Sequence, residues 1–362
     1  MKRITFFICT LGSGGAEHQM SLLANFMTER GYQTEIVTFG DIDDHYPLDK
    51  RVGRIRLASG KSKLAKTLAI FRYFLFVKTD CIISFSQRAN MLMLPAMFFR
   101  RKPKVIVGER NYTVGPSDRI EQSLFRYLYR KSDYIVPNSH AQGEYISKMK
   151  PSLQTKIRVI TNYTDLKQYN VQPQEFSGAV KIGIFCRYAE QKNYERFLRA
   201  VAIAKRQTDL EFHVSWYGSK TTLGAESQDY SRFMALVSEL DLQDTVSAND
   251  SVKNVAELLP HFNVLCLPSL YEGFSNSLSE YICAGRAVIA SDVSDNSVMV
   301  HDGENGYLFN PLDVQDMADI IADIVSKSSI ELTFMGYRSR EIAESLFDKR
   351  KFVNSYIDLI ES

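Results

Sequence analysis

Two acidic side chains, Glu272 and Glu280, stand eight positions apart in a polar segment that follows the apolar run Val264–Leu267. A carboxylate accepts two hydroxyl hydrogen bonds at once, which suits the diol of a ribose or a hexose. The residues from Gly273 onward would present successive backbone N–H groups at a helix start, which suits a phosphate. The alternative interpretation is an acid that complements a helix dipole, together with a surface glutamate.

A basic pair follows another apolar run. Arg187 and Lys192 come directly after Val180–Cys186. Two cations just beyond a strand can offset the charge of a pyrophosphate. Because arginine and lysine are also common on protein surfaces, this pair indicates a phosphate site only in combination with the other segments.

A glycine-rich loop, Gly12-Ser-Gly-Gly-Ala-Glu17, lies between the first apolar run and the first helical pattern. Glycines allow a tight turn and a close approach to a ligand, and the helix start can hold an anion. A dinucleotide fingerprint requires a glycine where Glu17 stands and an acid where Thr38 stands. The loop therefore disfavours NAD, and a tight turn without a ligand remains the alternative.

These segments must be positioned by the chain as a whole, in which short apolar runs alternate with longer amphipathic ones. Such alternation is typical of βαβ units with a parallel sheet, where ligands bind beyond the carboxyl ends of the strands. The predicted strands are Ile4–Cys9, Thr34–Thr38, Arg54–Leu57, Cys81–Phe85, Lys104–Val107, Tyr134–Pro137, Ile157–Ile160, Val180–Cys186, Glu211–Trp216, Val264–Leu267, Ala287–Ala290 and Gly306–Phe309. The helices predicted between them include Ala16–Arg30, Lys63–Val77, Arg119–Arg130, Ala141–Lys148, Asn193–Lys205, Ser227–Leu240, Ser277–Ala284 and Asp313–Ser326.

A chain of 362 residues exceeds the usual size of one hydrophobic core, so two domains are expected. The polar, aperiodic stretch 166–178 is interpreted as a linker. It separates a Rossmann-like domain at 1–165 from a second one at 179–345, and the sheets are expected to face a central cleft. The last helix, 346–362, is predicted to extend past the second sheet and could cross back onto the first domain.

The net charge of +2 hides an asymmetry between the halves. Residues 1–165 hold 26 Lys and Arg against 14 Asp and Glu, whereas the remainder holds 18 against 28. The basic half suggests an anionic partner, although a solvated surface is the alternative. No nucleic-acid recognition motif accompanies it, so we expect no nucleic-acid partner. Five cysteines without a C-x-x-C pair and six histidines without H-x-x-x-H spacing predict neither disulfides nor a metal site.

Together, these segments resemble the retaining glycosyltransferases of group 1 (family 4), which have the GT-B fold. The resemblance covers nearly the whole chain, and it is carried by the order and spacing of the motifs rather than by any one of them. The matching residues are the glycine loop Gly14-Gly-Ala-Glu17, the basic pair Arg187 and Lys192, the E-x7-E motif at Glu272 and Glu280, and the segment Asp302-Gly-Glu-Asn-Gly306.

The resemblance implies roles for individual residues. Glu280 would hold the donor ribose and Glu272 the transferred sugar, while Arg187 and Lys192 would neutralise the leaving diphosphate. The implied catalytic residues are thus Arg187, Lys192 and Glu272. The implied donor-binding residues are Gly14, Gly15, Arg187, Lys192, Glu272, Gly273, Phe274, Ser275, Asn276 and Glu280.

Two segments depart from the family pattern. Glu109, Arg110 and Asn111 look like an acceptor-side segment, where some relatives carry a histidine, so no protein base is named. The stretch Val293–Val298 replaces a Gly-Gly-x-x-Glu of many relatives, which bears on sugar selectivity or local packing but not on the diphosphate residues.

The resemblance implies a hexosyltransferase that needs no metal and no cofactor. It would move a hexose or N-acetylhexosamine, with UDP as the favoured carrier, to a hydroxyl of a lipid-linked or polysaccharide acceptor in cell-surface glycan synthesis. The alternatives are a sugar-nucleotide epimerase or phosphorylase on the same fold, or a catalytically degenerate subunit that only binds sugar nucleotides.

Two stretches, Lys61–Lys78 and Met91–Lys104, combine basic and apolar residues in a way that suits an anionic membrane surface. Core-packing helices with basic ends are the alternative. Because no apolar window approaches the ~20 residues of a spanning helix, we expect a cytoplasmic protein, attached peripherally to the inner face of the cytoplasmic membrane if these stretches bind lipid.

Overall fold

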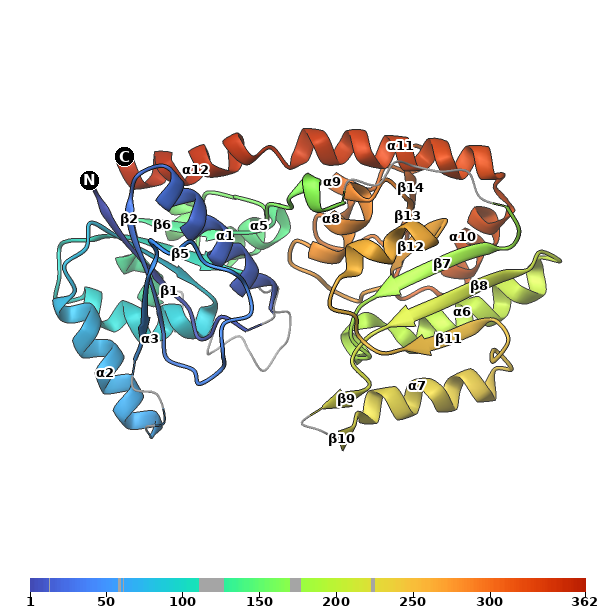
Figure 1. Ribbon diagram of the computed structural model, residues 1–362, viewed down its shortest axis with the longest axis horizontal. Helices are drawn as coiled ribbons and strands as arrows, with labels where there is room; N and C mark the ends of the chain where they lie inside the picture. The colour runs from blue at the N-terminus through green and yellow to red at the C-terminus, as the bar shows by residue number, and fades with distance from the viewer. Residues whose placement is uncertain (13, 58–59, 61, 111–126, 170–176, 223–224) are drawn as a thin grey trace. The chain divides into compact units, whose positions relative to one another are not determined.

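The computed structural model describes residues 1–12, 14–57, 60, 62–110, 127–169, 177–222 and 225–362. The chain forms two compact units (Figure 1). Unit 1 comprises Met1–Tyr163 and Lys349–Ser362, and unit 2 comprises Thr164–Asp348. Each unit contains one parallel six-stranded sheet, so the predicted α/β class with two parallel sheets is confirmed.

Unit 1 has the strand order β3-β2-β1-β4-β5-β6. β4 is buried along its whole length, as expected for a parallel strand with helices on both faces. The strands are β1 (Arg3–Phe7), β2 (Gln33–Thr38), β3 (Gly53–Arg56), β4 (Cys81–Phe85), β5 (Lys104–Glu109) and β6 (Tyr134–Pro137). The helices are α1 (Gly15–Glu29), α2 (Lys63–Phe76), α3 (Gln87–Met97) and α5 (His140–Met149).

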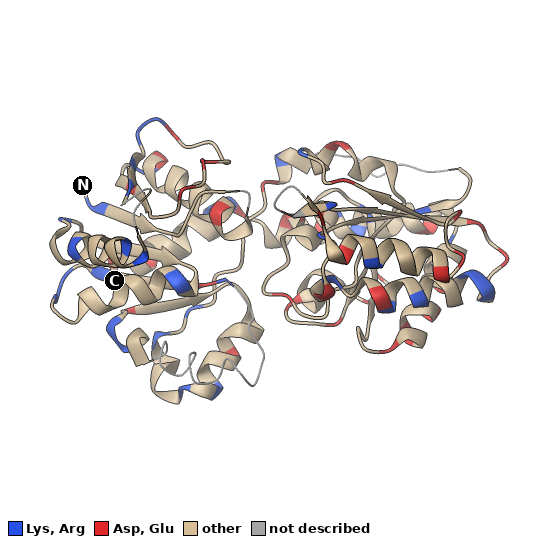
Figure 2. Cartoon of the chain, turned by 90° about the horizontal axis from the view of Figure 1, so that it is seen from below, with Lys and Arg blue, Asp and Glu red and all other residues tan. Residues whose placement is uncertain are grey.

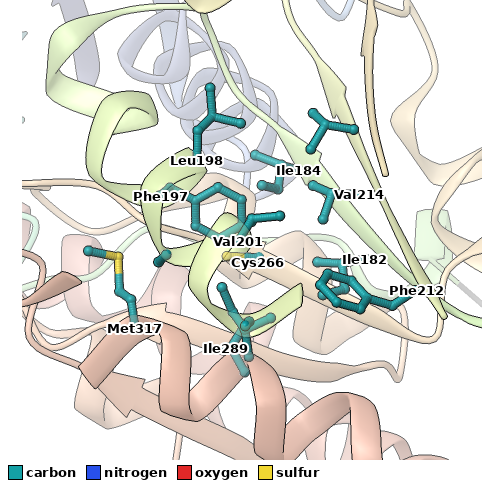
Figure 3. Packing of buried hydrophobic residues seen from close by; sticks show 14 of the residues in the cluster. Ile182, Ile184, Phe197, Leu198, Val201, Phe212, Val214, Cys266, Ile289 and Met317 are labelled. Atoms are coloured by element: carbon teal, nitrogen blue, oxygen red, sulfur yellow. The ribbon is translucent and has the colours of Figure 1, made fainter. Parts of the chain in front are cut away.

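Unit 2 has the order β11-β8-β7-β12-β13-β14. Its core lies where apolar side chains of the central strands meet Phe197, Val201 and Met317 of the covering helices (Figure 3). The strands are β7 (Val180–Phe185), β8 (Phe212–Tyr217), β11 (Val246–Asn249), β12 (Val264–Leu267), β13 (Ala287–Ser291) and β14 (Gly306–Phe309). The helices are α6 (Tyr194–Gln207), α7 (Gln228–Glu239), α8 (Asn276–Cys283), α9 (Asn296–Met299), α10 (Val314–Ser326) and α11 (Ser329–Leu346), and β9 (Thr221–Thr222) pairs with β10 (Ala225–Glu226).

Some element predictions need correction. The stretch 157–160 is not a strand: it forms one bridge, from Ile157 to Ile135, beside β6. The Arg158 guanidinium donates a hydrogen bond to the carbonyl oxygen of Ile157, so this carbonyl is paired within its own segment. α3 and β11 were not predicted, and most of the predicted helix 119–130 lies outside the described residues.

The last helix, α12 (Lys349–Glu361), belongs to unit 1. Lys349 pairs with Glu29 at 2.8 Å, and Glu361 pairs with Lys2 at 2.6 Å. Between these ends, the buried Tyr356 hydroxyl lies 2.6 Å from a guanidinium nitrogen of Arg110. The chain terminus therefore supports the residue that follows β5. No described helix is both long and apolar enough to cross a membrane.

We predict that Tyr356→Phe weakens the attachment of α12, because one N–H group of the buried Arg110 loses its acceptor. The cost of such a loss is about 1–3 kcal/mol, so backbone amides of α12 should exchange with deuterium roughly tenfold faster or more. Hydrogen exchange read by mass spectrometry measures this. The control is Tyr337→Phe, whose side chain is half exposed. Unchanged exchange in α12 would contradict the prediction.

Candidate active site

The loops after β7 and β12 meet at the carboxyl edge of the unit 2 sheet. These strands are neighbours, although their last positions, Phe185 and Leu267, are 82 positions apart in the sequence. The strand order reverses between them, since β8 lies on the other side of β7. This reversal is the place where parallel α/β sheets bind ligands. Arg187 and Lys192 follow one strand, and Glu272 and Glu280 follow the other.

Lys192 and Glu272 form an ion pair, with 2.5 Å between Nζ and Oε1. Each side chain is only 12% exposed. Burial disfavours the charged ammonium, but the attraction of Glu272 and the hydrogen bond to it outweigh that cost, so the pKa of Lys192 is raised. The structure therefore joins two of the predicted site residues directly.

Arg187 is exposed, and its positive charge acts to lower the pKa of Lys192. The two cations are thus close enough to repel each other, and the carboxylate of Glu272 offsets the charge of Lys192. An anion that approached both would be favoured by the uncompensated charge of Arg187. This arrangement suits a diphosphate.

Hydrogen bonds hold the loop of Glu272 in place. Leu270 donates its backbone N–H to the carbonyl of Gln191 at 2.8 Å, and the Gln191 side chain donates to Tyr271 O at 3.0 Å. Ser294, which has a positive φ of 52°, donates its hydroxyl to Gly273 O at 2.6 Å. The segment that departs from the family pattern at 293–298 thus supports the loop that carries Glu272.

Helix α8 begins directly after this loop. Ser275 caps it by accepting a hydrogen bond from Leu278 N, and Asn276 is its first residue. Ser277 donates to the Phe185 carbonyl at 3.1 Å, so the helix start is tied to the end of β7. The side chain of Phe274 is buried against Phe347, so only the backbone groups of this residue can offer polar contacts to a ligand.

Glu280 lies one turn into α8. The residue as a whole is partly exposed, but its carboxyl group is enclosed by protein. This burial raises the pKa of Glu280 to about 7, and a hydrogen bond from Tyr169 opposes the shift. A carboxyl with a strongly perturbed pKa beside a phosphate-type site is typical of a functional group.

The remaining predicted residues lie in unit 1. Gly14 caps α1 with its backbone, and Gly15 is the first residue of the helix. A side chain at Gly14 would clash with the Glu17 carboxylate unless that side chain moved. Because the end of the Glu17 side chain can move and Gly14 has an ordinary φ of −80°, the backbone itself does not require glycine at this position.

Glu109 ends β5, Arg110 follows it, and both are buried. Gln142 donates to Glu109 at 2.6 Å, and Arg110 lies over the Phe85 ring at 3.8 Å while donating to Asn162. The third residue of this segment, Asn111, lies outside the described residues.

Sequence reasoning missed several residues of the site. Gln191 and Ser294 support the loop of Glu272, and Tyr169 contacts Glu280. Gln191 adjoins Lys192 and Ser294 lies in the stretch Val293–Val298, but nothing in the sequence indicates which loop either of them holds, and Tyr169 lies in no motif. Among the described residues, no three His, Cys, Asp or Glu side chains are grouped as metal ligands.

Comparison with known proteins bears on both units. A family model described as "Glycosyl transferases group 1" matches residues 179–327, and one described as "Glycosyltransferase Family 4" matches residues 13–168. The chain is 24% identical to a Campylobacter jejuni enzyme, N-acetylgalactosamine-N,N'-diacetylbacillosaminyl-diphospho-undecaprenol 4-alpha-N-acetylgalactosaminyltransferase, with 81% of each chain covered. It is 25% identical to N-acetyl-alpha-D-glucosaminyl L-malate synthase of Bacillus anthracis, over 70% of this chain and 68% of that one.

Solved structures support the fold. Sucrose-phosphate synthase of Thermosynechococcus elongatus superposes with a TM-score of 0.84 at 18% identity, covering 100% of this chain and 98% of that one. Anabaena HepE, solved in complex with UDP-glucose, superposes with a TM-score of 0.80 at 18% identity over the whole of both chains. The predicted GT-B fold is thereby confirmed.

We predict that the pair of Lys192 and Glu272 is energetically coupled. Glu272→Gln should lower the free energy of unfolding by about 2–4 kcal/mol, because Lys192 keeps its charge without a carboxylate, and adding Lys192→Met should recover part of that loss. Urea unfolding followed by the fluorescence of Trp216, the only tryptophan and buried in unit 2, measures the coupling.

The exposed pair of Arg199 and Glu239, which lies in unit 2 as Trp216 does, serves as the control for this cycle. Its side chains are 51% and 65% exposed, so its coupling should stay below about 0.5 kcal/mol. A coupling between Lys192 and Glu272 no larger than this would contradict the prediction.

Proposed function

Since the chain belongs to the group 1 (family 4) glycosyltransferases, we propose that it moves a hexose or an N-acetylhexosamine from a nucleotide-diphosphate sugar to an acceptor hydroxyl. The proposed donor site rests on the ion pair of Lys192 and Glu272, which lies beside Arg187 at the edge of the unit 2 sheet. Two cations, a carboxylate and a helix start in one place are what a sugar diphosphate requires.

The donor roles follow from this arrangement. Arg187 and Lys192 bind the diphosphate, and Glu280 accepts hydrogen bonds from the ribose diol. Glu272 turns to the hydroxyls of the transferred sugar while Lys192 exchanges part of its carboxylate contact for phosphate oxygen. The backbone from Gly273 to Asn276 contributes N–H groups.

The two cations also serve the reaction itself. As the glycosidic bond to the diphosphate breaks, negative charge grows on the leaving phosphate, and cations already in place stabilise it without reorganisation. In the reaction that we propose, the leaving phosphate helps to deprotonate the acceptor hydroxyl on the same face of the sugar, so the anomeric configuration is retained and no metal is required.

UDP is the favoured carrier, because Anabaena HepE has been solved with UDP-glucose. The Campylobacter jejuni relative is named for a diphospho-undecaprenol acceptor, which supports a lipid-linked or polysaccharide acceptor in cell-surface glycan synthesis. Glu109, Arg110 and Asn111 are the proposed acceptor-side segment. The alternatives are an epimerase, a phosphorylase or a subunit that only binds sugar nucleotides. Each would bind its ligand at the same cations without transferring the sugar to a second hydroxyl.

We predict that UDP stabilises the protein more than GDP, ADP or NAD does, without added metal. At 100 times its Kd, a ligand adds about 2.7 kcal/mol, which gives a shift of several degrees in Tm. Glu280→Ala should abolish the shift, whereas Glu239→Ala, an exposed glutamate of α7, should keep it. No shift with any diphosphate, or a shift with NAD alone, would refute the proposed donor site.

We further propose that unit 1 attaches to an anionic membrane at the cytoplasmic face. Leu64, Leu68 and Phe76 lie on one side of α2 and are 71%, 60% and 69% exposed. Phe99, which is 72% exposed, continues this surface because its ring packs 6.0 Å from that of Phe71 on α2. Leu64, Leu68, Phe76 and Phe99 together are called the α2 stripe.

Exposed basic residues accompany the α2 stripe (Figure 2 marks the charged residues). They are Lys63, Arg72, Arg101 and Lys102, and Arg72 lies within the stripe because it is four residues from both Leu68 and Phe76. The predicted second stretch is mainly core, because Met93, Leu94 and Met97 of α3 are buried. An exposed apolar surface interspersed with basic residues complements a bilayer of anionic lipids.

We predict that the protein sediments with phosphatidylglycerol vesicles at low salt but not with phosphatidylcholine vesicles. Leu68→Glu together with Phe99→Glu should reduce vesicle binding at least tenfold, since two apolar contacts are lost and two negative charges are added. Phe334→Glu, at a 61% exposed position on α11, is the control and should bind normally. Equal binding of all three proteins, or none by wild type, would refute the membrane proposal.

A further inference from the structure

Two residues outside every sequence motif contact the helix of Glu280. Tyr169 ends the short 3-10 helix η3 (Leu166–Tyr169), which packs against α8. Arg340 lies on α11, which also packs against α8. Both belong to unit 2, as Glu280 does.

Arg340 joins the ends of two helices through one nitrogen. Its Nη1 lies 2.7 Å from Cys283 O at the end of α8 and 3.0 Å from Tyr169 O at the end of η3. Its Nε donates to Glu344 at 3.0 Å. Carbonyl oxygens at helix ends lack partners within the helix and carry negative partial charge, so a guanidinium is a favourable ligand for both ends.

Tyr169 connects this junction to the carboxylate. Its backbone is held by Arg340, its side chain is buried, and its hydroxyl hydrogen bonds to Glu280. A phenol donates to a carboxylate and thereby favours the charged form of the acid. The bond also fixes the direction of the carboxylate, which leaves its other acceptor positions for a ligand.

We propose that Tyr169 and Arg340 are positioning residues for the donor: Arg340 fastens η3 to the end of α8, and the Tyr169 hydroxyl aims the Glu280 carboxylate. This proposal rests on the proposed function, in which Glu280 accepts the ribose diol. Only the ionised carboxylate accepts both hydroxyl hydrogen bonds, so donor affinity follows its charge state.

The surroundings of Glu280 make this contact decisive near neutral pH. Burial raises its pKa to about 7, and the hydrogen bond from Tyr169 lowers it. Two further titratable groups that interact with Glu280 are Tyr281 and Cys283 on α8, and Cys283 in turn interacts with Asp165 before η3 and with Arg340 on α11. Tyr281 and Cys283 are neutral at pH 7, because burial raises the pKa of each.

The test is the Kd of UDP, measured by calorimetry between pH 6 and pH 9 on wild type, Tyr169→Phe, Arg340→Ala, Arg340→Lys and Glu280→Gln. For wild type, Kd should rise as the pH falls below about 7. For Tyr169→Phe the midpoint should move up by about one unit, which weakens binding about fivefold at pH 7. The curves should converge at pH 9, where both carboxyls are ionised.

Arg340 has its own expected pattern. Arg340→Ala should move the midpoint in the same direction as Tyr169→Phe, and Arg340→Lys should restore most of it, because a lysine can still reach the carbonyls. Arg338→Lys, an exposed neighbour on α11, should match wild type. A purely structural role for Tyr169 and Arg340 would instead change Kd by the same factor at every pH, and that result would overturn the proposal.

A second readout separates this proposal from the donor site. The pKa of Glu280 in the free protein is measured by carbon-13 NMR of labelled glutamate, with Glu280→Gln identifying the signal. An unmoved titration in Tyr169→Phe would overturn the positioning role even if UDP binds as proposed. UDP affinity unchanged in Glu280→Gln at every pH would instead refute the donor role of Glu280, while the titration would still test the contact with Tyr169.

Discussion

A lysine and a glutamate that are both largely withdrawn from water have to stay together, and this requirement organises the site in unit 2. Lys192 and Glu272 come from loops after neighbouring strands, and each is only 12% exposed. Separating them would leave a buried charge without a partner, which costs more than most single contacts supply. The backbone bonds between Gln191 and Leu270, and the hydroxyl of Ser294 on Gly273, therefore hold both loops at the spacing that the pair requires.

Helix α8, which follows the loop of Glu272, holds a second, unfavourable feature. Raising the pKa of Glu280 from 4.5 to about 7 means that its ionised form is less stable in the folded protein than in water, by on the order of 3 kcal/mol. Because the folded state prefers the protonated acid, this cost appears as the pH rises from about 4.5 to about 7 and is fully present above it. A chain selected for stability alone would place glutamine there, so the cost is consistent with a ligand that requires a carboxylate.

Sequence patterns were sufficient for most strands of the two sheets but not for the side-chain contacts that the strand order produces. The apolar runs of β1, β4, β7 and β12 are continuous because both faces of each sheet are covered, and this signal is local. β11, with the sequence Val-Ser-Ala-Asn, lies at the sheet edge and carries no such signal. Arg187, Lys192, Glu272 and Glu280 could be named from motif order, but the pairing of Lys192 with Glu272 spans 80 positions and depends on strand order.

Contacts that depend on helix packing were beyond sequence reasoning for a related reason. Arg340 and Tyr169 are 171 positions apart, and nothing near Arg340 distinguishes it from the exposed Arg338 two residues earlier. Composition also could not separate α2 from α3, since both combine apolar residues with basic neighbours. α3 buries Met93 and Met97 in the core, whereas the α2 stripe stays exposed. In both cases the deciding quantity is burial, and burial is fixed by which elements become neighbours. Residues that act on a site through a backbone carbonyl or a single hydroxyl are therefore found by following hydrogen bonds outward from the perturbed group, as from Glu280 to Tyr169 and on to Arg340.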